Sequence, residues 1–254
     1  MFGIVVAARV LMDPPLRRPE DILSREERDL LEPGALPRSA ELMWAMPTDP
    51  VDPGAGWLFE PLFKGTRCLA VYDGESVHVL ENGSQPISGI DPAICSSLLE
   101  AGPRRFALDG LLVDVGSGRE SFRIEGEDQP LPVTEEAGKS EERAGSGDEL
   151  RVRLIAFDLL HVEELNLRPA PLLLRRKLLR GLIRFSPALL YCRESTAPGD
   201  TVFDRAARQG WRGVVAKRTA SAYVAGPSPD WRAWQRESAS DPDRRVSRPP
   251  RPDP

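Results

Sequence analysis

The chain has few cysteines and few histidines. It contains three Cys and two His among 254 residues. Cys68, Cys95 and Cys192 are odd in number and irregularly spaced, which argues against a disulfide framework and is typical of a reducing compartment such as the cytoplasm. His78 and His161 have no Cys at ligand spacing. The sequence therefore predicts no His/Cys zinc site.

Lysine and long apolar runs are also scarce. No segment approaches the ~18 consecutive apolar residues that a membrane-spanning helix needs, so we expect no membrane partner. The 34 basic and 39 acidic residues give a formal net charge of −5, which excludes a global attraction to nucleic acid. The few lysines are easy to follow through the chain: they are Lys64, Lys139, Lys177 and Lys217.

What the chain does have is enough apolar sequence for a core, at 41% of its residues. Alternation, long apolar runs and Asp-Gly or Asn-Gly turns predict strands at 56–63, 66–72, 76–80, 105–115, 151–160, 188–192 and 213–217. Helical periodicity predicts helices that begin at Asp91, Pro171 and Asp200. This order predicts an α+β fold of mainly antiparallel sheets flanked by helices.

Composition divides the chain into one ordered domain and three looser segments. Residues 1–40 are rich in proline and charge, and we expect a poorly packed arm with a capping-box pattern before a short helix. Residues 125–149 have almost no apolar content and predict a flexible insertion. Residues 237–254 predict a disordered tail. The ordered domain then covers 41–236.

Six short segments occur in an order and at spacings that together resemble a known family. They are WLFEPLFKGTR (57–67), ENG (81–83), LDGLLV (108–113), IAFDLLH (155–161), RGVVAKR (212–218) and SPDWRAW (228–234). The chain resembles the adenylation domain of ATP-dependent DNA ligases, and in particular the ligase domains of bacterial end-joining ligases. This resemblance implies the ligase nucleotidyltransferase fold, ATP and Mg²⁺ as cofactors, DNA or DNA-repair proteins as partners, and a role in DNA repair and recombination.

The chemistry of this family explains which residues matter. A lysine amine attacks the α-phosphorus of ATP and holds AMP as a phosphoramide. Glutamates hold the divalent metal, and further lysines stabilise the transferring phosphoryl group. The resemblance implies that Arg67 faces the ribose, that Phe157 faces the adenine ring and that Lys217 lies on the strand at the phosphate end. Together with Glu60, these are the candidate nucleotide-binding residues.

The sequence departs from the family pattern at the residues that perform the first chemical step. The nucleophilic lysine of the first segment is Leu62 here, and the aspartate two residues later is Lys64. The metal-binding glutamates of the third and fifth segments are Leu111 and Arg212. Leucine has no amine, so Leu62 removes the covalent step. An arginine at a metal position would repel the ion.

Further departures lie in the second and last segments. The arginine of the second segment is Glu81, and the two lysines of the last segment are Ala233 and Gln235. Loss of one transition-state charge typically costs ~3–4 kcal/mol. The chain also ends soon after the last segment, so we expect no C-terminal OB-fold domain.

Three interpretations stay open at this point. The first is a catalytically degenerate adenylation domain, a pseudoenzyme that binds a nucleotide or a partner. The second is an active but atypical ligase that adenylates itself on Lys64, because residues 62 and 64 of an extended segment point to the same face. The third is a non-catalytic structural subunit of a DNA-repair assembly.

The candidate aromatic residues also have a plain structural interpretation. Phe157 has about equal claims as a core aromatic residue and as a ring that stacks on adenine. For the tryptophans near the C-terminus, Trp211, Trp231 and Trp234, we favour packing in the core or at a sheet edge over stacking on bases.

The charged candidates have similar alternatives. Arg67 is as well explained by a buried ion pair with Glu60 as by contact with a ribose. Asp109 and Asp158 are candidates for a residual metal site, although we favour pairing with arginine.

Overall fold

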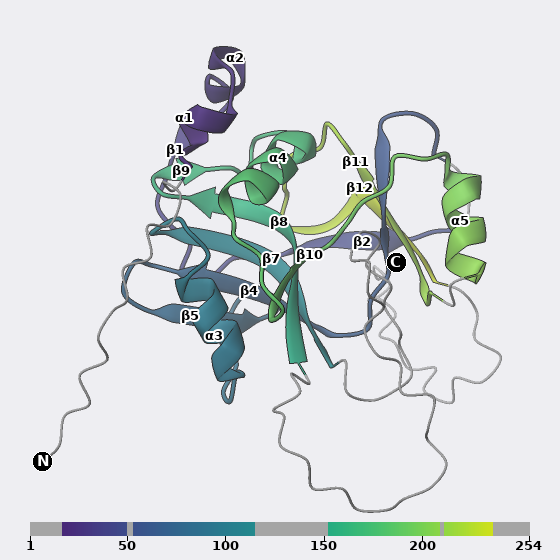
Figure 1. The fold of residues 1–254 in the computed structure, drawn as a ribbon. Helices are drawn as coiled ribbons and strands as arrows, with labels where there is room; N and C mark the ends of the chain where they lie inside the picture. The colour runs from purple at the N-terminus through teal and green to yellow at the C-terminus, as the bar shows by residue number, and fades with distance from the viewer. Residues whose placement is uncertain (1–16, 50–52, 115–151, 209–210, 236–254) are drawn as a thin grey trace, which may run out of the picture.

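The computed structural model describes residues 17–49, 53–114, 152–208 and 211–235. Two β-sheets pack face to face, and helices cover their outer faces (Figure 1). The predicted insertion at 125–149, the predicted tail at 237–254 and the first part of the arm lie outside the described residues. The predicted mixture of helices and mainly antiparallel sheets is confirmed.

Sheet A is built mostly from strands that follow one another along the chain. Its order is β1 (Glu32–Pro33), β9 (Leu165–Asn166), β8 (Val152–Val162), β7 (Phe106–Asp114), β4 (Thr66–Tyr72), β5 (Val77–Glu81) and β6 (Gln85–Pro86), and β10 (Leu189–Tyr191) pairs with β8. Only the β10–β8 pairing is parallel among the described strands of this sheet. The β4–β5 hairpin turns at Asp73-Gly74, where Gly74 has a φ of 98° that a side chain would disfavour.

Sheet B joins segments that are far apart in the sequence. Its order is β2 (Met43–Pro47), β12 (Gly226–Gln235), β11 (Gly213–Arg218) and β3 (Trp57–Pro61). Strand β2 runs parallel to β12, and the other pairs are antiparallel. Strand β3 ends at Pro61, two residues before the predicted end at Phe63. Lys64 therefore lies in the connection to β4 rather than in a strand.

The helices are α1 (Pro19–Ile22), α2 (Arg25–Arg28), α3 (Pro92–Leu99), α4 (Leu172–Leu182) and α5 (Gly199–Arg208). Asp91 caps α3, because its carboxylate accepts a hydrogen bond of 2.8 Å from the Ala93 amide. Helix α5 begins at Gly199, so Asp200 lies in the first turn rather than at the predicted cap. No described helix has the length and apolar character to cross a membrane.

Three clusters of buried apolar residues fill the spaces between these layers. The largest, here called the helix-side core, lies between sheet A and helices α3 and α4 and includes Ile94 and Leu178. The second lies between the two sheets and includes Trp231. The third lies between sheet B and α5, where Phe59 packs with Val202.

The described part of the arm is attached more firmly than its composition led us to expect. The predicted capping box is present, because Ser24 and Glu27 bond to each other's backbone amides. Glu27 also forms an ion pair with Lys177 of α4 at 2.7 Å. A Cβ atom added at Gly181 would lie 2.6 Å from Ile22, so α1 packs closely on α4. Most of the arm residues from 17 to 40, the part that the structure describes, are nevertheless exposed.

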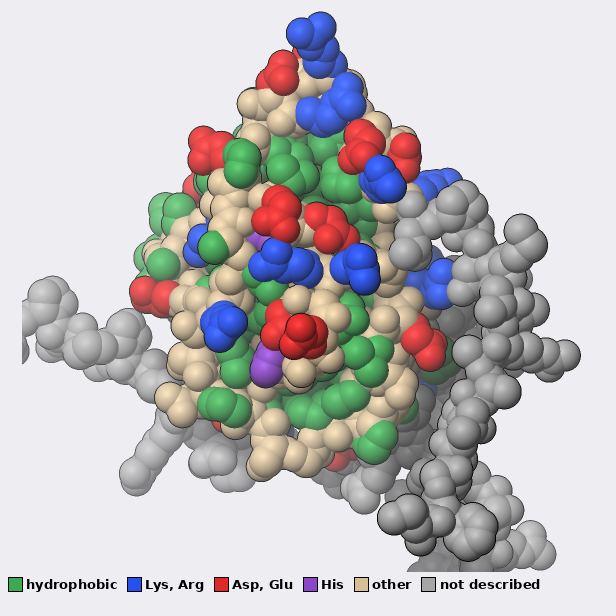
Figure 2. Space-filling view, turned by 90° about the vertical axis from the view of Figure 1, so that its left-hand side faces the viewer, with side chains coloured by type: hydrophobic (Ala, Val, Ile, Leu, Met, Phe, Trp, Pro, Cys, Tyr) green, Lys and Arg blue, Asp and Glu red, His purple; other side chains and the backbone are tan. Residues whose placement is uncertain are grey.

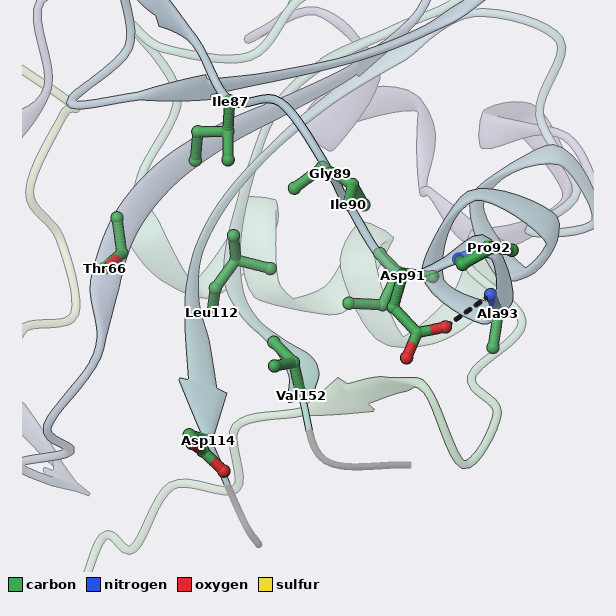
Figure 3. A pocket seen from close by; sticks show the side chains of 11 residues that line it. Thr66, Ile87, Gly89, Ile90, Asp91, Pro92, Ala93, Leu112, Asp114 and Val152 are labelled. Atoms are coloured by element: carbon green, nitrogen blue, oxygen red, sulfur yellow. Dashed lines mark hydrogen bonds between the residues drawn. The ribbon is translucent and has the colours of Figure 1, made fainter. Parts of the chain in front are cut away.

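The side of the molecule that carries the arm has a mixed surface. Figure 2 shows acidic and basic side chains interspersed there, with hydrophobic side chains gathered below the arm. A pocket of about 800 Å³ opens where α3 meets the ends of β4, β7 and β8 (Figure 3). Its walls are mostly apolar, with Ile87, Ile90 and Leu112, and Asp91 and Asp114 add carboxylates.

Candidate functional site

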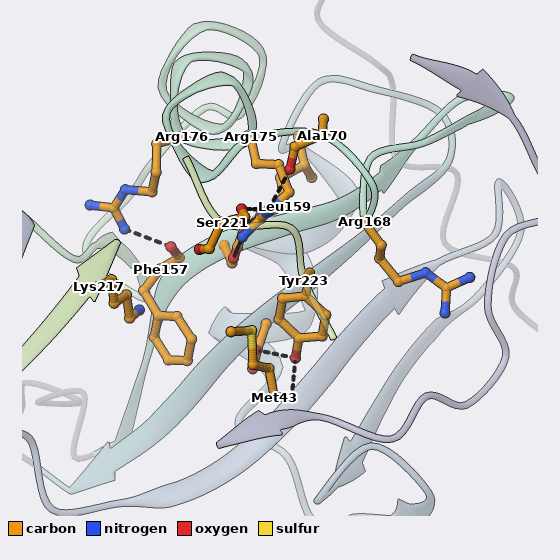
Figure 4. A network of polar contacts seen from close by, with 12 residues as sticks. Met43, Phe157, Leu159, Arg168, Ala170, Arg175, Arg176, Lys217, Ser221 and Tyr223 are labelled. Carbon is orange, nitrogen blue, oxygen red and sulfur yellow. Dashed lines mark hydrogen bonds and ion pairs between the residues drawn. The ribbon is translucent and has the colours of Figure 1, made fainter. Parts of the chain in front are cut away.

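The four candidate nucleotide-binding residues converge between the two sheets. Glu60 comes from β3, Arg67 from β4, Phe157 from β8 and Lys217 from β11. Glu60, Phe157 and Lys217 are only 2–4% exposed. Figure 4 shows Lys217 beside the ring of Phe157. The structure therefore brings together residues that lie in four separate segments of the sequence.

Arg67 is held by a carboxylate, but not by the one that we considered. Its Nε and NH2 atoms each lie 2.6 Å from an oxygen of Asp109, and NH2 also donates to the Met43 carbonyl at 3.0 Å. Burial lowers the pKa of Arg67, but the Asp109 carboxylate outweighs burial and holds that pKa above its usual value. The suggested pair of Arg67 with Glu60 is wrong, because neighbouring strands β4 and β7 place Asp109 nearer.

Tyr223 completes the contacts of Asp109. Its hydroxyl donates to Asp109 at 2.6 Å and accepts from the Met43 amide at 3.0 Å. Burial, followed by the charge of Asp109, raises the pKa of Tyr223, so the hydroxyl keeps the proton that it donates. Both oxygens of the Asp109 carboxylate are thus engaged by protein donors.

Glu60 forms the second set of ion pairs in this layer. Its Oε2 atom lies 2.6 Å from the Lys217 ammonium, and its Oε1 atom lies 2.9 Å from NH1 of Arg176. Arg176 comes from α4, is fully buried and also pairs with Glu194. The same guanidinium donates to the Phe157 carbonyl at 2.6 Å (Figure 4). Arg176 therefore joins α4 to both sheets.

Aromatic rings surround the two inward-facing cations. The Lys217 nitrogen lies 4.0 Å from the ring centre of Phe157 and 4.1 Å from that of Trp231. The Arg67 guanidinium carbon lies 4.5 Å from the centre of Phe157 and 5.2 Å from that of Trp44. These are distances at which cations are attracted to aromatic faces. Phe157 is 4% exposed, so its ring is covered by these neighbours.

Asp158 pairs with a different arginine, Arg175. Its two carboxylate oxygens lie 2.9 and 2.8 Å from Nε and NH2 of Arg175, which is fully buried. Arg175 also donates to the Ala170 and Ser221 carbonyls at 2.6 and 2.9 Å. Asp158 and Asp109 are register partners on β8 and β7, yet each carboxylate is engaged on both oxygens by its own arginine.

These contacts bear on the metal that the resemblance implies. A divalent ion needs several free oxygen ligands, whereas the oxygens of Asp109 and Asp158 already bind guanidinium groups. Among the described residues, no three His, Cys, Asp or Glu side chains gather at a metal-binding distance. Among the described residues, pairing with arginine is the role that the structure gives both aspartates, as we favoured.

The residues that depart from the family pattern lie at the edge of this layer. The Leu62 amide donates to the Gly213 carbonyl at 3.0 Å, and its side chain is partly buried. Leu111 is the register partner of Arg67 and packs against the apolar cluster between the sheets. Lys64 is exposed and does not join the four candidate residues.

Two residues of this site were missed from the sequence. Arg175 and Arg176 were counted only as part of a leucine-rich helix, yet they are among the fully buried side chains. The sequence carried a signal for their burial. They lie three and four positions after Leu172, and this spacing places them on the apolar face of α4. Trp231 is 1% exposed and packs in the core, as we favoured. The charged side chains of this layer and of α4 are here called the polar seam: Glu60, Arg67, Asp109, Asp158, Arg175, Arg176 and Lys217.

Comparison with known proteins identifies related sequences. The chain is 29% identical over 164 residues to a probable DNA ligase of Sorangium cellulosum, covering 64% of this chain and 30% of that protein. It is 28% identical over 180 residues to a probable DNA ligase of Streptomyces griseus, covering 66% and 33%. The matched segments thus span about a third of these relatives. No family model matches the sequence.

Solved structures show the same fold. A mycobacterial DNA ligase D complexed with ATP and MES has a TM-score of 0.57 at 22% identity, over 77% of this chain and 60% of that one. This chain resembles the adenylation domain of ATP-dependent DNA ligases. The ligase domain from M. tuberculosis LigD gives a TM-score of 0.55 at 22% identity, over 79% and 60%. The ligase-like domain described here therefore has the nucleotidyltransferase fold of these proteins.

Proposed function

We propose that this ligase-like domain acts in DNA repair without adenylating itself. The relatives named probable DNA ligase support DNA or a DNA-repair protein as its partner. The observation that carries the proposal is Leu62, which stands where the family has the lysine that captures AMP. A leucine side chain cannot form a phosphoramide.

Among the described residues, neither Lys217 nor Lys64 is placed to replace the missing amine. Lys217 is the lysine of the described residues that lies between the sheets, and its nitrogen is engaged by Glu60 at 2.6 Å. This ion pair holds the nitrogen against the carboxylate of Glu60. Lys64 is exposed and follows the end of β3, so the pleat of that strand does not aim it between the sheets.

Other positions of the family pattern support the same proposal. Phosphate groups need nearby cations or metal ions, whereas Leu111 places an apolar side chain at a metal-binding position of the family. The arginine-engaged carboxylates of Asp109 and Asp158 add no metal ligands in exchange. We therefore derive no chemical step through Mg²⁺.

A labelling experiment tests the proposal. The purified chain is incubated with ATP labelled on the α-phosphate and with Mg²⁺, and is then run on a denaturing gel beside an active ligase. We expect no labelled band. A band that disappears in Lys64→Ala would overturn the proposal in favour of the atypical ligase. Leu62→Lys is the matched variant, and we expect it also to stay unlabelled, because the metal-binding positions remain altered.

The polar seam favours one of the two non-catalytic roles. Each candidate nucleotide-binding residue has an ionic or aromatic partner within the protein, although Oε1 of Glu60, Nε of Arg176 and Nε1 of Trp231 make no hydrogen bond with the described residues. This favours a structural role in a DNA-repair assembly over a role that depends on bound ATP. Calorimetric titration with ATP separates them, and heat that saturates at micromolar ATP would favour the nucleotide-dependent role.

A further inference from the structure

The side chain of Lys217 fills the space beside two aromatic rings that a bound ligand would otherwise need. Its nitrogen lies 4.0 Å from the ring centre of Phe157 and 4.1 Å from that of Trp231, so it contacts both rings at once. Phe157 and Trp231 are 4% and 1% exposed. An ammonium group buried against two aromatic faces is attracted more strongly than one at an exposed site.

Glu60 and Arg176 hold the ammonium in this position. Glu60 contacts Lys217 through one oxygen at 2.6 Å and Arg176 through the other at 2.9 Å. Arg176 in turn donates to the backbone carbonyl of Phe157 at 2.6 Å. If Lys217 moved away, Glu60 would lose a partner inside the protein, and a buried carboxylate without its partner is costly.

We infer that Lys217 acts as an internal plug, which closes the ring of Phe157 to a nucleobase. The inference rests on the proposed function and deepens it, because it says why the adenylation fold is retained here without a nucleotide. A base needs an open ring face to stack on. The ring of Phe157 is contacted by Lys217 at 4.0 Å and by Arg67 at 4.5 Å from its centre.

A pair of variants separates the plug from the rest of the layer. Lys217→Ala removes the side chain from the two rings, whereas Lys217→Met fills a similar volume without the charge. Binding is measured by equilibrium dialysis with radiolabelled AMP, which cannot adenylate the protein because it has no pyrophosphate to release. We expect Lys217→Ala to bind AMP at least ~10-fold more tightly than the wild type or Lys217→Met.

Each result of the dialysis has a meaning for the plug. Equal AMP binding by the wild type and Lys217→Ala would overturn the inference. So would no binding by a Lys217→Ala variant whose circular dichroism is that of the wild type. A labelled adduct with ATP would overturn the proposed function instead, so the two failures are distinguishable.

If Lys217→Ala does not fold, a measurement on the wild-type protein tests the inference instead. Lysine labelled with ¹³C at the ε-carbon gives one methylene signal for each lysine, and arginine variants at Lys64 and Lys177 help to assign them. Ring currents at these distances should shift the Lys217 signal upfield of the others. We expect that shift, and no change on addition of millimolar AMP. An unshifted signal, or one that AMP moves, would overturn the inference.

Discussion

The two faces of sheet A hold their buried side chains in different ways. On the face covered by α3 and α4, the helix-side core is a continuous apolar cluster in which Leu108, Leu178 and Leu179 are fully buried. On the face toward sheet B, buried apolar residues share the space with charged residues of the polar seam such as Arg67, Asp109 and Lys217. The same strands supply both faces, because successive side chains of a strand point in opposite directions.

This difference shows what the fold requires in order to bury charged side chains. Apolar packing needs complementary volume only, whereas each buried charge needs a partner at hydrogen-bond distance. The seam meets that need with bidentate or branched contacts, such as those of Arg175 with Asp158 and of Glu60 with Lys217 and Arg176. The polar seam is therefore specific in its pairing, and the helix-side core is specific in its shape.

The largest expected effect comes from breaking one pair of the seam. Asp158→Ala leaves the fully buried Arg175 without its carboxylate, and we expect the free energy of unfolding to fall by about 3–5 kcal/mol. Urea denaturation measures the loss. The double variant Asp158→Leu with Arg175→Met should recover much of it, since both charges are then absent. A single variant that costs no more than a surface substitution would contradict this account of the seam.

A smaller effect is expected from opening a cavity in the helix-side core. Leu178→Ala should lower the free energy of unfolding by about 3 kcal/mol, because Leu178 is fully buried and neighbouring side chains close the cavity only in part. Leu173 lies on the same helix but is 49% exposed, so Leu173→Ala is the matched control. Urea denaturation should show little change for that control. Equal losses for both variants would mean that the helix is not packed as described.

The smallest effect concerns a buried titratable residue outside the seam. His161 is 1% exposed, and its Nδ1 atom has no hydrogen-bond partner among the described residues. Burial lowers the pKa of His161 below the usual 6.5. The unfolded chain therefore takes up a proton more readily than the folded one, so the free energy of unfolding should fall as the pH drops below about 6.5.

Urea midpoints across this pH range test the contribution of His161. His161→Asn should have a flatter pH dependence than the wild type. His78→Asn is the control, because the side chain of His78 is 52% exposed beside Asp73, and its removal should leave most of the slope. A wild-type slope retained in full by His161→Asn would show that other groups cause it.

Sheet A was predictable where a local turn links neighbouring strands, although β7 pairs with β4 and β8 across longer stretches of sequence. Thr66–Tyr72 was predicted with its exact bounds, and the Asp-Gly turn after it gave the hairpin. Sheet B was less predictable. Strands β3 and β11 were predicted singly, β2 and β12 were not predicted, and the pairing joins β2 to β12 and β11 to β3 across long stretches of sequence. The local sequence does not indicate which distant strands pair. The end of β3 was predicted too late for the same reason.

The candidate site was likewise predictable only in part. Motif order selected Glu60, Arg67, Phe157 and Lys217, and the structure brings them into one layer. Their partners were not predictable from spacing: Arg67 pairs with Asp109 and not with Glu60. The attachment of the arm to α4 was missed for the same reason, since Glu27 and Lys177 are 150 residues apart.

The sequence by itself determined which chemical groups are available to this protein. It places Leu62 and Leu111 at positions where the resemblance to the ligase family predicts an amine and a carboxylate. Only the tertiary structure decided which buried charge meets which, and that the Lys217 ammonium lies against two aromatic rings. The physical reason is that ionic and cation–aromatic contacts depend on distances of a few ångströms, and the packing of the two sheets sets these distances.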